Sequence, residues 1–177
     1  MTAPTKSMTK AEIREAVTAF HKAWNDHDVV AVQGAITPDV VWTSPNTPGP
    51  ERVVHGRAAA AADFESGIAA LPDMKLVLDD LHIFTTDDAQ VAFSTWTNTG
   101  TMTGSFEGMA ATGKQARIRG ICQYRFRDGL IAEHTMAYDR LDMCQQLGLL
   151  PYEADRSFRT FVQVQRVARG VRRLIPF

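Results

Sequence analysis

The chain has 177 residues, of which 45% are hydrophobic, and its net charge is −1. A chain of this length is about one domain and can bury a sizeable core. The near-neutral balance gives no indication of a polyanionic partner. No apolar run is long enough to span a membrane, and no segment near Met1 resembles a signal peptide, so the sequence predicts a cytoplasmic protein.

The first part of the chain has helical patterns. Thr9 and Glu12 form a capping box, and apolar residues then recur at helical spacing as far as Trp24, which predicts a first helix. Asp28 is the expected cap of a second, short helix that ends near residue 35. The Ala-rich segment 56–70 predicts a third helix.

Strand patterns dominate the chain after Met74. A short strand is expected earlier, at 40–43, before a proline-rich loop at 44–50. Four longer runs then alternate with turns, at about 75–84, 90–106, 114–126 and 130–143. Helices followed by long antiparallel strands predict an α+β fold, in which a curved sheet covers a helix and leaves a hollow at its open end.

The last two strands are joined by Asp128-Gly129, a strong hairpin signal because Gly takes positive φ without steric cost. Side chains alternate along a strand, so Asp139 and His134 lie on opposite faces. Gln123 and Arg125 share one face of the preceding strand. If Asp139 and Gln123 both face inward, a carboxylate and an amide line one cavity.

Three segments carry motifs with a family resemblance: Leu71–Met74, Gly100–Lys114 and the stretch 128–151. They resemble the patterns fPD, GTH.G.f.G..aTGk and dGkIaEhw...D...l..QLG.lP of the SnoaL-like polyketide cyclases, within the NTF2-like superfamily. The resemblance implies an NTF2-like cone-shaped barrel over residues 1–151. Residues 152–177 are then a separate C-terminal extension.

The resemblance also implies a function. In that family the late aspartate is the acid/base, assisted by a Gln-x-His pair on the preceding strand. Asp139 and Gln123 match these positions, whereas Arg125 and Met102 replace two family histidines, and Thr135 stands where the family often has Trp. The implied protein is a homodimer, paired through the outer face of the sheet. It is a cofactor-independent cyclase or isomerase that acts on a hydrophobic, carbonyl-rich metabolite.

Each candidate residue has an expected role and a structural alternative. Asp139 is expected to transfer protons, although an aspartate at a strand end is also a common cap or ion-pair partner. Gln123 is expected either to stabilise an oxyanion or to be a solvent-facing strand residue. Arg125 is expected either to bind an anionic group or to pair with Asp139 or Glu133. The expected walls of the substrate site are six aromatic or apolar side chains and one threonine: Phe20, Trp24, Trp42, Phe64, Trp96, Met102 and Thr135.

Two other functions stay open. One is a related hydrolase or epoxide-opening enzyme that uses Asp139 and Arg125, and the other is a non-catalytic small-molecule binding protein, since fold does not fix function. The histidines lack metal-ligand spacing, so no metal and no cofactor is expected. Cys122 and Cys144 are expected to be buried thiols.

The C-terminal extension is basic. Residues 152–177 hold six arginines against Glu153 and Asp155, a net charge of +4, so residues 1–151 carry −5. Its apolar residues recur at helical spacing, which predicts a basic amphipathic helix over 155–174. Because aromatic interleaving is absent and the rest of the chain is acidic, nucleic-acid and membrane binding are disfavoured. We expect an apolar stripe to be buried against the body or a second subunit: Phe158, Phe161, Val164, Ala168 and Val171.

Overall fold

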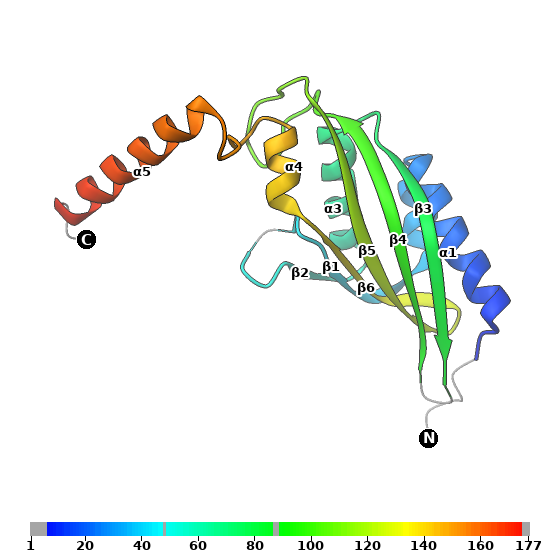
Figure 1. Ribbon diagram of the computed structural model, residues 1–177. Helices are drawn as coiled ribbons and strands as arrows, with labels where there is room; N and C mark the ends of the chain where they lie inside the picture. Colours follow the sequence, from blue (N-terminus) through cyan, green and yellow to red (C-terminus); the bar gives the residue numbers. More distant parts are fainter. Residues whose placement is uncertain (1–6, 48, 87–88, 175–177) are drawn as a thin grey trace.

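A computed structural model describes residues 7–47, 49–86 and 89–174 of the chain, and it confirms the α+β class (Figure 1). The elements in chain order are α1 (Lys10–Asn25), α2 (Val29–Ala35), β1 (Ile36–Thr43), β2 (Val53–His55), α3 (Arg57–Ala70), β3 (Lys75–Thr85), β4 (Gln90–Thr101), β5 (Gln115–Arg127), β6 (Leu130–Tyr138), α4 (Arg140–Gln146) and α5 (Arg156–Leu174). No helix within the described residues is both long and apolar enough to cross a membrane.

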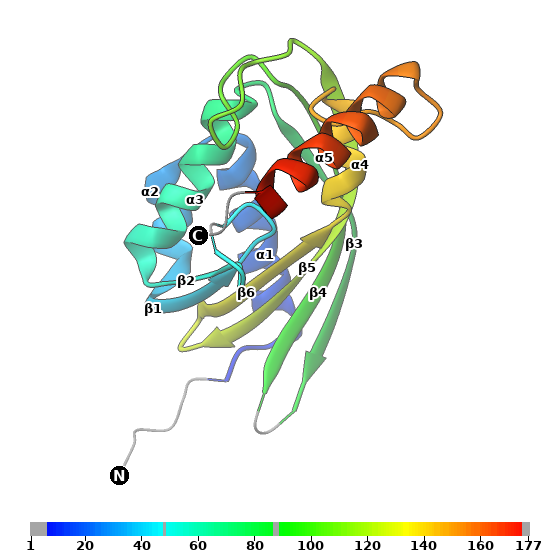
Figure 2. The ribbon, with the colours of Figure 1, turned by 90° about the vertical axis from the view of Figure 1, so that its left-hand side faces the viewer.

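The six strands form one curved sheet in the order β2-β1-β6-β5-β4-β3. All neighbours are antiparallel except β1 and β6, which run parallel with Trp42 opposite His134. The sheet is therefore mixed rather than wholly antiparallel, and it stays open between β2 and β3. The helices α1 and α3 cover one face, while the opposite face is bare in the described part of this single chain (Figures 1 and 2).

The core lies between α1, α3 and the covered face of the sheet. The capping box is present, because the Glu12 backbone N–H donates to Thr9 Oγ1 at 3.2 Å and the Thr9 N–H donates to Glu12 Oε2 at 2.7 Å. From this start, α1 packs one apolar stripe against the sheet, and the Phe20 and Trp24 side chains of this stripe are buried. Burying each such side chain is worth roughly 1.5–3 kcal/mol, so packing fixes the helix in place.

The turn at Asp128 and Gly129 has φ values of 53° and 83°, as a two-residue hairpin requires. The register then shifts between Arg125 and Phe126, which is a β-bulge. The bulge places Ile131 on the same inward face as His134. Regular alternation would have put the two on opposite faces.

The face of the hairpin that is buried is the opposite of the face that was expected to be buried. Cys122 and Tyr124 on β5, and His134 and Met136 on β6, are the buried side chains. Three residues that were expected to line a cavity instead occupy the outer face of the sheet: Gln123, Arg125 and Thr135. The fourth, Asp139, follows β6 and is exposed. The alternation was predicted correctly, but the choice of inner face was wrong, because alternation alone does not say which face the helices cover.

Other elements also differ from the sequence-based expectation. The last strand ends at Tyr138 rather than near residue 143, because the Asp139 carboxylate accepts the Asp142 N–H at 2.9 Å and starts α4. The strand expected over 90–106 ends at Thr101. The short strand β2 was not predicted; it pairs with β1 through Val53–His55.

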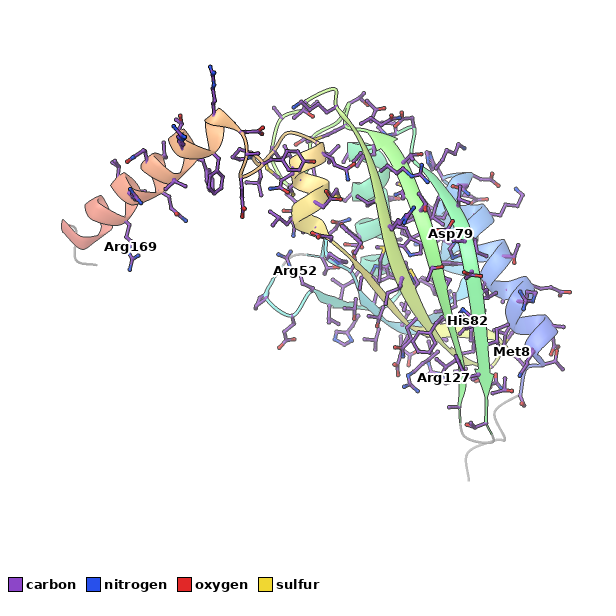
Figure 3. All side chains as sticks on the ribbon, viewed as in Figure 1. Met8, Arg52, Asp79, His82, Arg127 and Arg169 are labelled. Carbon is purple, nitrogen blue, oxygen red and sulfur yellow. The ribbon has the colours of Figure 1, made fainter. Side chains whose placement is uncertain are left out.

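Helix α5 extends away from the body, and Arg169 projects from it into space that the body does not cover (Figures 1 and 3). Its apolar stripe is open in the single chain, where Phe161 is 43% and Val164 is 63% exposed. The expectation that this stripe packs on the chain's own body is therefore wrong. Burial against a second subunit stays a prediction, and the side chain of Val171 lies outside the described part.

Candidate active site

Two adjoining cavities lie between the helices and the inner face of the sheet. The larger, which we term the main cavity, has a volume of about 60 Å³ and contains the polar side chains Asn46, Asp63, Asn98 and Tyr138. The smaller, which we term the histidine pocket, has a volume of about 10 Å³ and is lined by His21, Tyr124 and His134. Trp24, Leu76 and Met136 belong to the walls of both.

Asp63 is the one carboxylate among the described residues that line the main cavity, and no Lys, Arg or His side chain lines it. Helix α3 supplies Asp63, and two donors hold its carboxylate from opposite sides. Trp42 Nε1 donates to Oδ2 at 2.9 Å, and Thr47 Oγ1 donates to Oδ1 at 3.0 Å. The carboxylate is thus oriented by fixed donors rather than by an ion pair.

Tyr138, at the end of β6, is the second reactive group of the main cavity. Its hydroxyl donates to Asn46 Oδ1. Burial raises the pKa of Tyr138 and outweighs the opposing effects of the Arg140 charge and the Asn46 hydrogen bond, so the hydroxyl stays protonated at neutral pH. The loop that carries Asn46 is itself fixed, because Arg140 Nη1 donates to the Pro45 carbonyl and Arg52 Nη1 to the Thr47 carbonyl, both at 2.9 Å.

Two further polar atoms of the main-cavity walls lack partners. Asn98 Oδ1 and Trp24 Nε1 are buried with no hydrogen bond among the described protein atoms. Asn98 Nδ2 has only Met74 Sδ at 4.0 Å, a weak acceptor. The main cavity therefore has both a donor and an acceptor that are not satisfied within the protein.

The histidine pocket is built on a short hydrogen-bonded chain. The Tyr124 hydroxyl lies 2.7 Å from His21 Nε2 and 3.1 Å from Ser94 Oγ. His134 stacks on Trp42 with 4.0 Å between ring centroids and an interplanar angle of 25°. Burial lowers the pKa of His21 to about 4 and that of His134 to about 3, so both imidazoles are neutral at pH 7.

Of the expected wall residues, Trp24, Phe64 and Trp96 line the main cavity and Phe20 lines the histidine pocket. Trp42 is fully buried and acts through its bond to Asp63 rather than as a wall. Met102 is also fully buried, but in a second core cluster with Phe106 and Leu147, so its expected place in the substrate site is wrong. Thr135 is exposed on the outer face, outside both cavities.

The three expected catalytic residues lie outside both cavities as well. Asp139 is exposed and caps α4. Gln123 is half-buried on the outer face, opposite Thr135. Arg125 is exposed, with its Nε 3.2 Å from Glu133 Oε2, which is the structural alternative considered for it. The expectation that Asp139 and Gln123 line one cavity is wrong, because Gln123 lies on the face of β5 away from the helices and Asp139 follows β6 as the N-cap of α4.

Sequence reasoning missed Asp63, Tyr138 and Asn46 as site residues. One signal was present for Asp63, which interrupts the apolar run of α3 directly before the buried Phe64. Tyr138 alternates with the exposed Ala137 and Asp139. A prediction that used the correct inner face would therefore have identified Tyr138 as a site residue. Asn46 lies in a loop, and no periodicity relates it to the others. No group of three His, Cys, Asp or Glu side chains suited to a metal ion occurs in the described part of the chain.

The family model described as SnoaL-like polyketide cyclase matches residues 14–147. The chain is similar in structure to TsrD from Streptomyces laurentii, with 24% identity, a TM-score of 0.69, and coverage of 81% of this chain and 100% of TsrD. No curated protein sequence matches the chain significantly.

Two other solved structures are similar at comparable levels. AclR, a putative hydroxylase from Streptomyces galilaeus, has 23% identity and a TM-score of 0.68 over 92% of this chain and 97% of AclR. IdmH, a putative polyketide cyclase from Streptomyces antibioticus, has 26% identity and a TM-score of 0.64 over 76% of this chain and 97% of IdmH. The fold expected from the sequence resemblance, an NTF2-like α+β cone, is thereby confirmed, with an open sheet.

Proposed function

Because the chain belongs to the SnoaL-like polyketide cyclase family, we propose that it is a cofactor-independent cyclase or isomerase whose acid/base chemistry takes place in the main cavity. The substrate class is a hydrophobic, carbonyl-rich metabolite. The observation that carries the proposal is the presence of one carboxylate, Asp63, and one protonated hydroxyl, Tyr138, in the wall of a largely apolar cavity.

Asp63 is the proposed base. Its carboxylate removes a proton from a carbon that lies between carbonyl groups, and the electron pair left on that carbon attacks a second carbonyl carbon to form the new C–C bond. The alkoxide that results takes a proton from Tyr138. Transfer of the proton from Asp63 through a water molecule to the tyrosinate restores the site, so no cofactor or net proton is consumed.

The surroundings of Asp63 favour this role. Trp42 and Thr47 hold each carboxylate oxygen in place, so little reorganisation is needed when the substrate binds. No cation among the described lining residues neutralises the base. In an apolar cavity the Tyr138 and Asn46 dipoles stabilise developing negative charge more strongly than they would in water.

The cavity must widen to admit a substrate, because about 60 Å³ is far less than a polycyclic molecule occupies. Three of its wall residues are methionines, Met74, Met136 and Met143. Methionine is unbranched and changes rotamer easily, so these side chains can move aside without disturbing the sheet. We propose that they form the adaptable part of the substrate site.

Proton abstraction can be measured without knowing the natural substrate. Ethyl 2-benzylacetoacetate carries an aromatic ring and one exchangeable proton between two carbonyls, and solvent deuterium incorporation at that carbon is followed by NMR above the buffer rate. We expect Asp63→Asn to lower the enzyme-catalysed rate about 100-fold or more. Glu65→Gln, on an exposed position of the same helix, is the matched control and should leave the rate unchanged.

A second candidate function is non-catalytic binding of a small molecule, which the unpaired Asn98 and Trp24 atoms favour. If the probe binds the wild-type protein but acquires no deuterium above background, the binding function is supported and catalysis by Asp63 is rejected. The hydrolase or epoxide-opening alternative at Asp139 and Arg125 is not retained, because both lie outside the cavities.

We further propose a cytoplasmic homodimer that pairs through the bare outer face of the sheet. Phe93 and Ile121 expose 37% and 51% of their surface there, beside the exposed Phe84. The Phe84 and Phe93 rings already pack edge to face, with 5.9 Å between centroids. A contiguous apolar patch of this kind on a sheet face supports a protein interface.

A further inference from the structure

The histidine pocket is a polar site that the proposed chemistry does not use. His134 is 1% and His21 is 6% exposed, and the Nδ1 atom of each ring is buried with no hydrogen-bond partner among the described protein atoms. His21 Nε2 lies within hydrogen-bond distance of the Tyr124 hydroxyl, at 2.7 Å. His134 has ring contacts with Trp42, Phe20 and Tyr124 but no hydrogen bond to them.

Such an arrangement is unfavourable for the protein alone. A buried polar atom without a partner destabilises a fold, and a Leu or Phe side chain would fill the space of His134 without that penalty. Buried polar groups that lack partners therefore call for a ligand or an ordered water. Two neutral imidazoles and one tyrosine hydroxyl in the same small pocket give the ligand both donors and acceptors.

The size and charge of the pocket limit what can enter it. Its volume of about 10 Å³ is close to the space that one water-sized group needs. No side chain in it is charged at pH 7, because burial lowers the pKa of both histidines, raises that of Tyr124, and raises that of the Cys122 thiol to about 11. A carboxylate would find no counter-charge here, whereas an uncharged oxygen would be satisfied.

The position of the pocket relates it to the main cavity. Trp24, Leu76 and Met136 are wall residues of both spaces, so a ligand that fills the main cavity can extend one substituent past these side chains. We infer that the histidine pocket is a subsite for one uncharged oxygen substituent, a carbonyl or a hydroxyl, at the far end of a molecule whose apolar body lies in the main cavity. This inference rests on the proposed function only in assuming that the other end of the molecule, near Asp63, is the end that reacts.

This subsite narrows the substrate class. The molecule carries oxygen at both ends, with the reacting carbonyls near Asp63 and a second oxygen at His134, and an apolar segment between them contacts Trp24 and Met136. Tautomers of a neutral imidazole either donate or accept at a given nitrogen, so the subsite accommodates a ketone or a phenol.

The test compares two probes that differ by one hydroxyl, p-cresol and toluene, by protein-detected NMR titration of the full-length chain. We expect the wild-type protein to bind p-cresol about 10-fold tighter than toluene, in line with one satisfied buried hydrogen bond. In His134→Leu this preference should fall to about 1, with the affinity for toluene retained. Tyr138→Phe, which changes the polar group at the other end, should keep the preference.

Stability separates a ligand subsite from a structural role. Since His134 has no hydrogen bond to lose, His134→Leu should melt at or above the wild-type temperature. Should His134→Leu not fold, Tyr124→Phe keeps the ring and its volume, and it should reduce the p-cresol preference in the same direction.

Three results would overturn the inference: an unchanged preference in both variants, a preference lost in Tyr138→Phe instead, or a lower melting temperature of His134→Leu with the preference intact. The last would mean that the pocket holds only a structural water. Equilibrium binding does not depend on turnover, so a failure of Asp63 as the base would leave this test unaffected.

Discussion

At the scale of single residues, environment decides which titratable side chains can do chemistry. Asp139 matches a family motif, but its carboxylate caps α4 by accepting a hydrogen bond from the Asp142 N–H. Asp63 lies outside the three segments that resemble the family motifs, yet it is the carboxylate that lines the main cavity. A motif identifies a position in a fold, whereas the role of a residue depends on the face to which its strand or helix turns it.

The buried histidines make stability depend on pH. The folded-state pKa values of His21 and His134, about 4 and about 3, lie below the ordinary value of 6.5. Between the folded-state pKa values and 6.5, the unfolded chain therefore binds more protons than the folded chain. The stability that the neutral histidines contribute is complete above about pH 6.5 and is lost as the pH falls through 4 toward 3. Each histidine contributes up to about 1.4 kcal/mol per pH unit in that range.

We expect His134→Leu to flatten the acid side of the stability profile by about one proton. Urea denaturation between pH 4.5 and 7.5 measures this slope for the wild type and the variant. Parallel profiles for the wild type and His134→Leu would mean that His134 is not buried in the neutral form.

At the scale of elements, much of the fold could be predicted from sequence, because local signals and periodicity determine it. The capping box of α1, the Asp28 cap of α2 and the Asp128-Gly129 turn are local devices, and all three are present. The inner face of β5 and β6 could not be predicted. It depends on where α1 and α3 pack, and alternation is symmetric with respect to the two faces of a strand.

The β-bulge in β5–β6 and the parallel pairing of β1 with β6 also could not be predicted from local sequence patterns. The register shift at Arg125 and Phe126 reflects how β6 fits between β5 and β1, which are far apart in sequence. For the same reason the main cavity could be expected only as a hollow. Its polar residues come from α3, β4, β6 and the loop after β1, and only tertiary packing brings them together.

Gly120 on β5 provides a test of how tightly this inner face is packed. A Cβ at this position would lie 2.2 Å from Trp96 Cζ2 and 2.8 Å from the Ala137 carbonyl oxygen. Gly120→Ala should therefore displace Trp96 from the wall of the main cavity and destabilise the protein by roughly 1–3 kcal/mol. Thermal and urea denaturation, with Trp fluorescence to follow Trp96, measure both effects.

Gly34 in α2 is the matched control, because a Cβ there meets no atom within 4 Å. Gly34→Ala should be neutral or stabilising by up to about 1 kcal/mol. If Gly120→Ala were as stable as the wild type, the contact between β5 and Trp96 would be looser than described.

At the scale of the whole molecule, two apolar surfaces have no partner within the described part of the single chain. One is the outer face of the sheet around Phe93 and Ile121, and the other is the stripe of α5 that includes Phe161. The positive charge of the extension and the negative charge of the body give α5 a favourable interaction with a second copy. Screening limits that contribution beyond about 8–10 Å, so the apolar term should dominate.

We expect Ile121→Glu to lower the dimer fraction in sedimentation velocity experiments, because it places a charge in the centre of the proposed interface. Deletion of the residues after Pro151 should lower that fraction too, with a weak dependence on salt. Val30→Glu, at an exposed position of α2 away from the sheet, is the control and should have no effect. A truncated chain that dimerises normally but loses affinity for anionic vesicles would make α5 a targeting helix instead.

We propose that catalysis takes place on the inner face of the sheet, at Asp63, and not at Asp139. The most direct test compares Asp63→Asn with Asp139→Asn in the deuterium-exchange assay under identical conditions. Asparagine is itself a good helix cap, so Asp139→Asn should keep the fold and at least half of the wild-type exchange rate, whereas Asp63→Asn should lose about 100-fold or more. The reverse result, with Asp139→Asn inactive and Asp63→Asn active, would contradict the account.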